Sequence, residues 1–155
     1  MAGAGAREID VRLASDAQGV VAYVTLDNRK KLNTLDRALM TDFIAKVGAL
    51  AGRDDLRALV LSGAGEAAFI GGANIDEMAA LDRASAEGYI TLVHRTCDCL
   101  RQLPVPVIAR IDGYALGAGL EVIAPTGQYD PTKLINWALP PPSPGCEGLG
   151  VGPPS

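Results

Sequence analysis

Strong positive charge, long apolar runs and paired cysteines are all missing from this sequence, and each absence excludes a class of protein. The 155 residues carry 14 Lys and Arg against 18 Asp and Glu, whereas nucleic-acid binders usually present a basic face. No apolar run is long enough to span a bilayer, and the first residues lack the apolar core of a signal peptide. Three cysteines do not form a disulfide framework. The composition therefore predicts a cytoplasmic protein with no nucleic-acid or membrane partner.

Histidine is also scarce, which narrows the chemistry further. A serine-nucleophile triad would have to use His94, the one histidine, and the sequence has no Gly-x-Ser-x-Gly turn. His94 lies close to Cys97 and Cys99, but on a helix Cys99 points away from the other two, so we expect no metal site. A dinucleotide-binding turn at residues 117–119 is disfavoured, because Val122 stands where its third small residue belongs.

What the sequence does contain is an alternation of predicted strands and helices. Strands 8–14 and 19–26 flank a polar loop and predict an antiparallel hairpin. Asn33 or Thr34 is the expected cap of the next helix. The remaining predicted elements are helix 35–51, strand 58–61, helix 75–81, helix 85–103 and strand 105–111. Strands that alternate with helices predict an α/β fold with a largely parallel sheet.

Proline marks a change in texture near the end of the chain. Eight of the ten prolines lie between Pro125 and Pro154, and no helical or strand period survives there. Such a composition is typical of a disordered segment. We therefore expect one folded domain over residues 6–123 and an irregular or disordered Pro/Gly-rich tail over residues 124–155.

Two glycine-rich segments each contain a turn from a predicted strand into a helix, and the second of these helices would start near Gly117. They are 68–78, AFIGGANIDEM, and 104–122, PVPVIARIDGYALGAGLEV. Glycines let a backbone turn sharply, and the first amides of a helix have no acceptor within it. Two such amides aimed at one oxygen form an oxyanion hole, and Glu121, one helical turn beyond Ala118, adds an acid–base group. Taken singly, the glycine pair also fits an ordinary turn, and the glutamate an ordinary surface residue.

The two glycine-rich segments, in this order and spacing, resemble the paired loops of the crotonase superfamily of enoyl-CoA hydratases and isomerases. The preceding DNRKKLNTLD resembles that family's Asn-Arg-Pro segment, with Lys30 in place of proline and Thr34 in place of the alanine of an Asn-Ala pair. The resemblance covers roughly residues 6–123. It implies a fragment of the family's ββα superhelix, with a mostly parallel sheet and flanking helices.

The resemblance also implies a site. The carbonyl of an acyl-CoA thioester would lie between the backbone N–H groups of Gly71 and Ala118, and Glu121 would activate the water that adds to the double bond. CoA is part of the substrate, so no separate cofactor and no metal are expected. Arg29, Lys30 and Lys31 would face CoA phosphates, or are simply a solvated charge run. The implied acyl-CoA-binding residues are Arg29, Lys31, Gly71, Gly72, Ala73, Asn74, Ile75, Gly117 and Ala118.

The sequence departs from the family after Glu121. Beyond Glu121 the family has a Cys-Asp pair, and this stretch of the sequence contains none. The family's second catalytic glutamate also has no counterpart, because Glu147 lacks the usual Phe-Gly-x-Pro-Glu context. We therefore expect a truncated member, and three interpretations stay open: an enoyl-CoA hydratase, a fragment that binds CoA esters or subunits without turnover, and a chain that does not fold stably alone. The trimers or hexamers usual in the family are an open expectation here.

Overall fold

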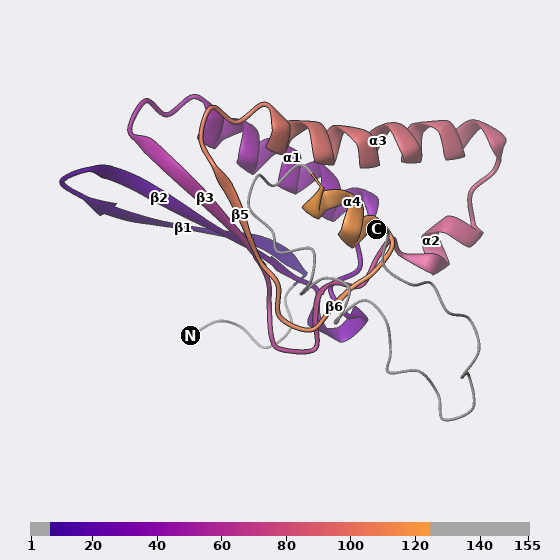
Figure 1. The fold of residues 1–155 in the computed structure, drawn as a ribbon. Helices are drawn as coiled ribbons and strands as arrows, with labels where there is room; N and C mark the ends of the chain where they lie inside the picture. Colours follow the sequence, from indigo (N-terminus) through magenta and orange to yellow (C-terminus); the bar gives the residue numbers. More distant parts are fainter. Residues whose placement is uncertain (1–6, 125–155) are drawn as a thin grey trace, which may run out of the picture.

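The structure is a computed structural model that describes residues 7–124, and its main element is a four-stranded sheet (Figure 1). Its strands are β1 (Glu8–Asp16), β2 (Gly19–Asp27), β3 (Leu56–Gly63) and β5 (Val107–Arg110), in the order β1-β2-β3-β5. The β1–β2 pair is antiparallel, and β2–β3 and β3–β5 are parallel. The predicted hairpin and the predicted mixed α/β fold are both confirmed. Asp16 closes the hairpin, since its Oδ1 accepts from the backbone N–H groups of Gln18 and Gly19.

Two long helices, α1 (Arg37–Ala51) and α3 (Arg83–Arg101), pack against each other beside this sheet (Figure 1). The cap of α1 differs from the prediction. Asp36, not Asn33 or Thr34, is the N-cap, and its Oδ1 accepts from the N–H of Leu39 at 3.0 Å. Helix α3 begins with a reciprocal capping box between Asp82 and Ser85. Both helices therefore start where a short side-chain oxygen replaces the missing backbone acceptor.

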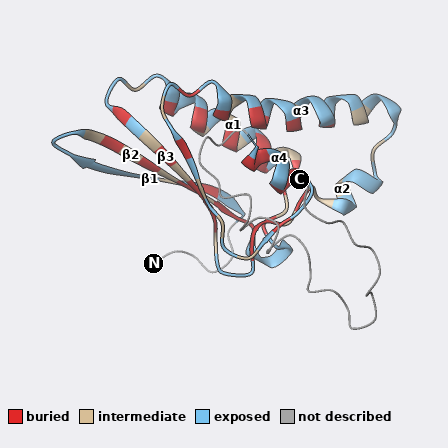
Figure 2. Ribbon diagram, viewed as in Figure 1, coloured by how far each residue is buried: buried red, intermediate tan, exposed pale blue. Residues whose placement is uncertain are grey.

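The core lies between one face of the sheet and these helices. Alternate residues of β2 are buried, so one face of that strand is apolar and covered. Figure 2 shows the matching buried stripes on α1 and α3 turned toward the interior. The largest side chains with almost no exposure are Tyr89, Phe43, Phe69, Ile9, Leu26, Leu35 and Met40, followed by further leucines and isoleucines.

A second, two-stranded sheet joins the two glycine-rich segments. It pairs β4 (Ala68–Ile70) with β6 (Tyr114–Ala115) in parallel, and each strand leads to a short helix, α2 (Ile75–Ala79) or α4 (Ala118–Ile123). A short 3-10 turn, η1 (Arg29–Lys31), follows β2 in the chain. The sheet thus brings together two segments that are distant in the sequence, since Ala68 pairs with Tyr114 and Ile70 with Ala115.

Two sequence-based predictions fall largely outside what the structure describes. The irregular tail expected over residues 124–155 lies outside the described residues apart from Ala124. The boundary proposed near residue 123 therefore stays a prediction.

No helix among residues 7–124 has the length and apolar character needed to cross a membrane.

Candidate active site

A cavity of about 350 Å³ opens where α2, α3 and α4 meet. Six residues expected at the site on sequence grounds, together with Glu121, line it: Gly71, Gly72, Ala73, Ile75, Gly117 and Ala118. Four lining residues were not assigned to the site from the sequence: Met78, Tyr89, Ile90 and Val93. Such a volume lies within the usual range for pockets that bind small molecules.

Gly71 does not present the free amide that the sequence predicted. Its N–H donates to the backbone carbonyl of Leu32 at 2.9 Å. A Cβ on Gly71 would lie 2.5 Å from that same oxygen, so glycine is required here for the close approach of two backbone segments. The prediction that Gly71 donates to a thioester oxygen is therefore wrong in this structure.

The amide of Ala73, two residues further on, has no such partner. The N–H of Leu35 donates to the carbonyl of Gly72 at 2.8 Å, and the N–H of Asn74 donates to the carbonyl of Leu35 at 2.7 Å. In a parallel bridge of this kind the flanking groups face the partner, so the N–H of the central residue points to the other side. Within residues 7–124 the Ala73 N–H has no acceptor.

The amide of Ala118 is unpaired for a different reason. Ala118 is the first residue of α4, and the amides after it already have acceptors, since Gly119 donates to Leu116 and Leu120 donates to Gly117. The N–H at the first helical position has no acceptor inside the helix. No other group in the described part of the chain accepts from it.

Two glycines hold these amides close together. Gly72 has φ +107° and Gly117 has φ +49°, a region that L side chains rarely enter. A Cβ on Gly117 would lie 4.0 Å from the Cα of Gly72, so the two loops lie against each other. The Leu116 N–H donates to the Ile70 carbonyl at 3.1 Å just before this point. The unpaired amides of Ala73 and Ala118 thus belong to adjoining loops on one cavity.

Glu121 lies one helical turn beyond Ala118 and lines the same cavity. Its side chain is exposed, and its carboxylate forms no hydrogen bond or ion pair with any residue between 7 and 124. Its backbone carbonyl accepts from the thiol of Cys97 on α3 at 3.5 Å, a contact that ties α4 to α3. The carboxylate is therefore not engaged by any other residue that the structure describes.

The rest of the cavity wall is apolar. Tyr89 is 1% exposed and Val93 7%, and they form its floor, while Ile75, at 78% exposed, is on the rim with Met78 and Ile90. The Tyr89 hydroxyl donates to the Leu35 carbonyl at 3.3 Å, and burial raises the pKa of Tyr89, with Glu77 adding to the rise. The phenol therefore stays neutral. Tyr89 and Val93 recur at helical spacing within the predicted helix 85–103, a pattern that indicates a core-facing stripe and does not reveal a cavity.

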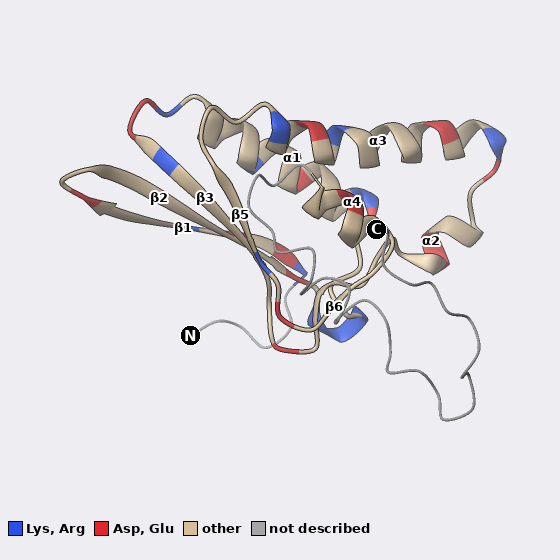
Figure 3. Ribbon diagram, viewed as in Figure 1, with Lys and Arg blue, Asp and Glu red and all other residues tan. Residues whose placement is uncertain are grey.

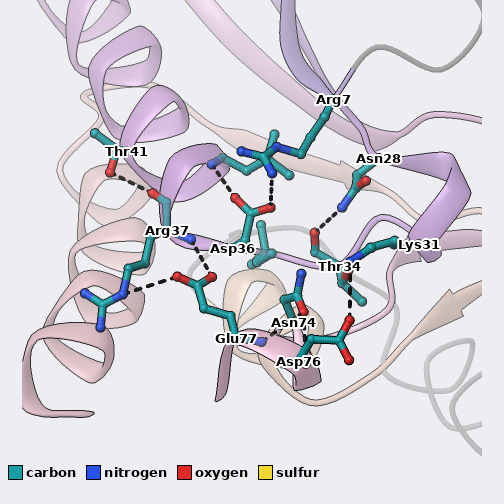
Figure 4. A network of polar contacts seen from close by, with 12 residues as sticks. Arg7, Asn28, Lys31, Thr34, Asp36, Arg37, Thr41, Asn74, Asp76 and Glu77 are labelled. Carbon is teal, nitrogen blue, oxygen red and sulfur yellow. Dashed lines mark hydrogen bonds and ion pairs between the residues drawn. The ribbon is translucent and has the colours of Figure 1, made fainter. Parts of the chain in front are cut away.

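The predicted basic residues lie apart from the cavity lining. Arg29 binds Asp27 through two hydrogen bonds of 2.9 and 2.7 Å, and this contact raises the pKa of Arg29. Lys31 lies 3.4 Å from Asp76 (Figure 4). Asn74, also predicted to bind substrate, instead caps α2, since its Oδ1 accepts from the N–H groups of Asp76 and Glu77. The structure does not bring these three side chains into the cavity.

Charge is spread over the molecule rather than gathered on one element. Figure 3 shows acidic and basic residues alternating along α3. The three residues of η1, Arg29, Lys30 and Lys31, are all basic. Among residues 7–124 no group of three or more His, Cys, Asp or Glu side chains is placed to hold a metal ion. Burial raises the pKa of Cys97, and raises that of Cys99 to about 12, so neither thiol is an activated nucleophile.

Comparison with known proteins decides the family. Residues 16–126 match the enoyl-CoA hydratase/isomerase family. The chain belongs to that family. The crotonase resemblance expected from the two glycine-rich segments is therefore confirmed.

Individual relatives agree with this assignment. A short-chain-enoyl-CoA hydratase of Clostridium acetobutylicum is 33% identical over 107 residues, which are 69% of this chain and 41% of the relative. The fatty acid oxidation complex subunit alpha of Idiomarina loihiensis is 31% identical over 104 residues, or 14% of its length. This member of the family thus spans less than half the length of these relatives.

Solved structures support the same fold. An enoyl-CoA hydratase from Bacillus anthracis superposes with a TM-score of 0.71 at 30% identity, over 77% of this chain and 45% of that one. One from Mycobacterium smegmatis gives a TM-score of 0.69 at 30% identity, over 76% and 45%. The predicted crotonase-like architecture, with a sheet and flanking helices, is confirmed by these neighbours.

Proposed function

We propose that this chain binds the thioester group of an acyl-CoA, with the thioester carbonyl oxygen between the N–H groups of Ala73 and Ala118. The observation that carries the proposal is the pair of unpaired amides on adjoining loops of one cavity. The family assignment supports the substrate class. The apolar floor and rim suit the acyl chain, since they bring no charged group other than Glu121 to the cavity.

The two amides would stabilise negative charge that develops on the carbonyl oxygen of a thioester during a reaction. In hydration of a 2-enoyl thioester, the water oxygen bonds to the β-carbon, the double-bond electrons move toward the carbonyl, and charge develops on the thioester oxygen. Preformed donors at that oxygen stabilise the resulting enolate. One such donor contributes about 2.7–4 kcal/mol to lowering the barrier.

Glu121 is the proposed general base. Its carboxylate has no partner among residues 7–124, so it is available to take the proton that water loses as it adds to the β-carbon. The enolate then needs a proton at the α-carbon. Within the described residues Glu121 is the one carboxylate lining the cavity, so the second proton donor has no candidate there.

Because no second carboxylate lines the cavity among residues 7–124, a second candidate function is also favoured: binding and polarising an acyl-CoA thioester without turnover. Both functions use the amide pair, and they differ in whether water is added to the bound thioester. They are separated by following whether bound substrate changes chemically.

The test mixes purified chain with crotonyl-CoA and follows loss of the conjugated thioester absorbance, while thermal unfolding is measured with crotonyl-CoA, butyryl-CoA and free CoA. Turnover that Glu121→Gln abolishes supports the hydratase. Protection by both thioesters beyond that given by free CoA, without turnover, supports the binding function. At 100-fold excess over Kd, a ligand that binds only the folded state adds about 2.7 kcal/mol to its stability. Equal melting temperatures with and without each thioester would refute both.

A further inference from the structure

A buried asparagine connects the segment before α1 to the loop that carries the Ala73 amide. Asn33 is 1% exposed, and all of its polar side-chain atoms are bonded. Its Nδ2 donates to the carbonyl of Ala64 at 3.0 Å and to that of Ala68 at 2.7 Å. Its Oδ1 accepts from the N–H of Asn28 at 2.9 Å. One side chain thus joins η1, the end of β3 and the start of β4.

The residues on either side of Asn33 complete the attachment. The Leu32 carbonyl accepts from Gly71, and Leu35 bonds both the Gly72 carbonyl and the Asn74 N–H. The polar groups of the loop are therefore fixed on both sides of Ala73, whose own N–H stays unpaired. Figure 4 shows the neighbouring contacts of the same segment, including Arg37 with Glu77 on α2.

The backbone around Asn33 is built to allow this arrangement. Leu32 and Asn33 have φ of 51° and 55°, a left-handed conformation that asparagine tolerates better than most residues. Gly63 leaves room for the side chain, because a Cβ there would lie 2.8 Å from Asn33 Nδ2. Strained backbone of this kind persists only where surrounding contacts enforce it.

We propose that Asn33 is a positioning residue for the oxyanion site: through Ala64 and Ala68 it sets the path of the loop and thereby the direction of the Ala73 N–H. Asn33 is absent from the cavity lining, so it acts through the loop rather than on the ligand. The inference rests on the proposed function, because it assigns a task to Asn33 only if Ala73 donates to a thioester oxygen.

The experiment uses the full chain and crotonyl-CoA isotopically labelled at the thioester carbonyl, and it measures the carbonyl stretching frequency of the bound molecule by difference infrared spectroscopy. Hydrogen bonding to the carbonyl lowers this frequency, and the frequency of bound ligand does not depend on how many molecules are bound. Asn33→Asp keeps the shape of the side chain and replaces the donating Nδ2 group with a carboxylate oxygen that accepts instead of donating. Asn33→Gly removes all three bonds without opposing the positive φ, and it serves if Asn33→Asp does not fold.

In the wild-type chain we expect a lowered frequency, and in either folded Asn33 variant we expect more than half of that lowering to be lost. Thr34→Ala is the matched control, because it alters the next residue, whose hydroxyl has no partner among the described residues, and should keep the wild-type frequency. A folded Asn33 variant with weaker binding but the wild-type frequency would overturn the positioning role while leaving the proposed function intact. A wild-type chain that binds without any lowering would overturn both.

Discussion

Replacing Ala118 with proline removes one proposed donor at small structural cost. Ala118 is the first residue of α4, a position where proline is well tolerated because the missing N–H has no intrahelical acceptor. The N–H has no acceptor in the described part of the chain, so no internal hydrogen bond is lost. We therefore expect Ala118→Pro to change the free energy of unfolding by no more than about 1 kcal/mol.

The expected loss at the site is larger. If Ala118 donates to the developing oxyanion, its removal raises the barrier by about 2.7–4 kcal/mol, a fall of about 10²–10³ in kcat. For a chain that binds without turnover, the equivalent result is a bound thioester carbonyl whose stretching frequency moves back toward that of free crotonyl-CoA.

The matched control is Ala118→Gly, which keeps the N–H and removes only the methyl group. Ala118 is 8% exposed, so this change should cost stability but leave the bound carbonyl frequency as in the wild type. Both variants are compared by urea unfolding and by infrared difference spectra. A proline variant that folds normally, binds crotonyl-CoA and retains the wild-type frequency would refute the assignment of Ala118 as a donor.

Three further predictions follow from single side chains. Thr34→Ala should raise the urea midpoint slightly or leave it unchanged. The buried Oγ1 of Thr34 has no partner among the described residues, and burying an unpaired hydroxyl costs about 1–3 kcal/mol. A clear loss of stability would show that the hydroxyl is bonded. Glu121→Gln should abolish any hydration while keeping thermal protection by butyryl-CoA, and loss of protection would mean that the carboxylate serves binding. Hydrogen bonds from Ser85 hold the pKa of Asp82 in the folded chain below its usual 3.8. The Asp82 carboxylate therefore contributes its full stabilisation of the folded state above pH 3.8, and this stabilisation is lost as the pH falls through the lower pKa of the folded state. Asp82→Asn should therefore lose less stability on acidification than the wild type in thermal scans between neutral pH and pH about 3.

Local patterns in the sequence predicted those parts of the fold that depend on neighbouring residues. The β1–β2 hairpin follows from alternation around a polar loop, and α3 from an apolar stripe that ends before Pro104. The cap of α1 was misassigned because Asn33 and Asp36 both have side chains suited to capping. The side chain of Asn33 instead donates to backbone carbonyls 31 and 35 residues away, and no local sequence pattern reveals such distant contacts.

The same limit explains the partial success at the site. The sequence identified both glycine-rich loops, and Ala118 and Glu121 both line the cavity. From the first loop it selected the amide of Gly71, which is already bonded, rather than the unpaired amide of Ala73, because a glycine pair suggests freedom without saying which amide is already used. The acceptor that takes the Gly71 N–H is the Leu32 carbonyl, and its position depends on two left-handed residues before α1.

The contact between Gly72 and Gly117 also determines how the site tolerates variation. A Cβ on Gly72 would lie 3.3 Å from the Leu116 carbonyl oxygen, and a Cβ on Gly117 would meet nothing closer than the Gly72 Cα at 4.0 Å. A side chain at either position would oppose the positive φ, so a substitution would strain the backbone turns that precede the amides of Ala73 and Ala118. Two residues of the cavity lining thus affect the site through backbone conformation alone, without contributing a side chain.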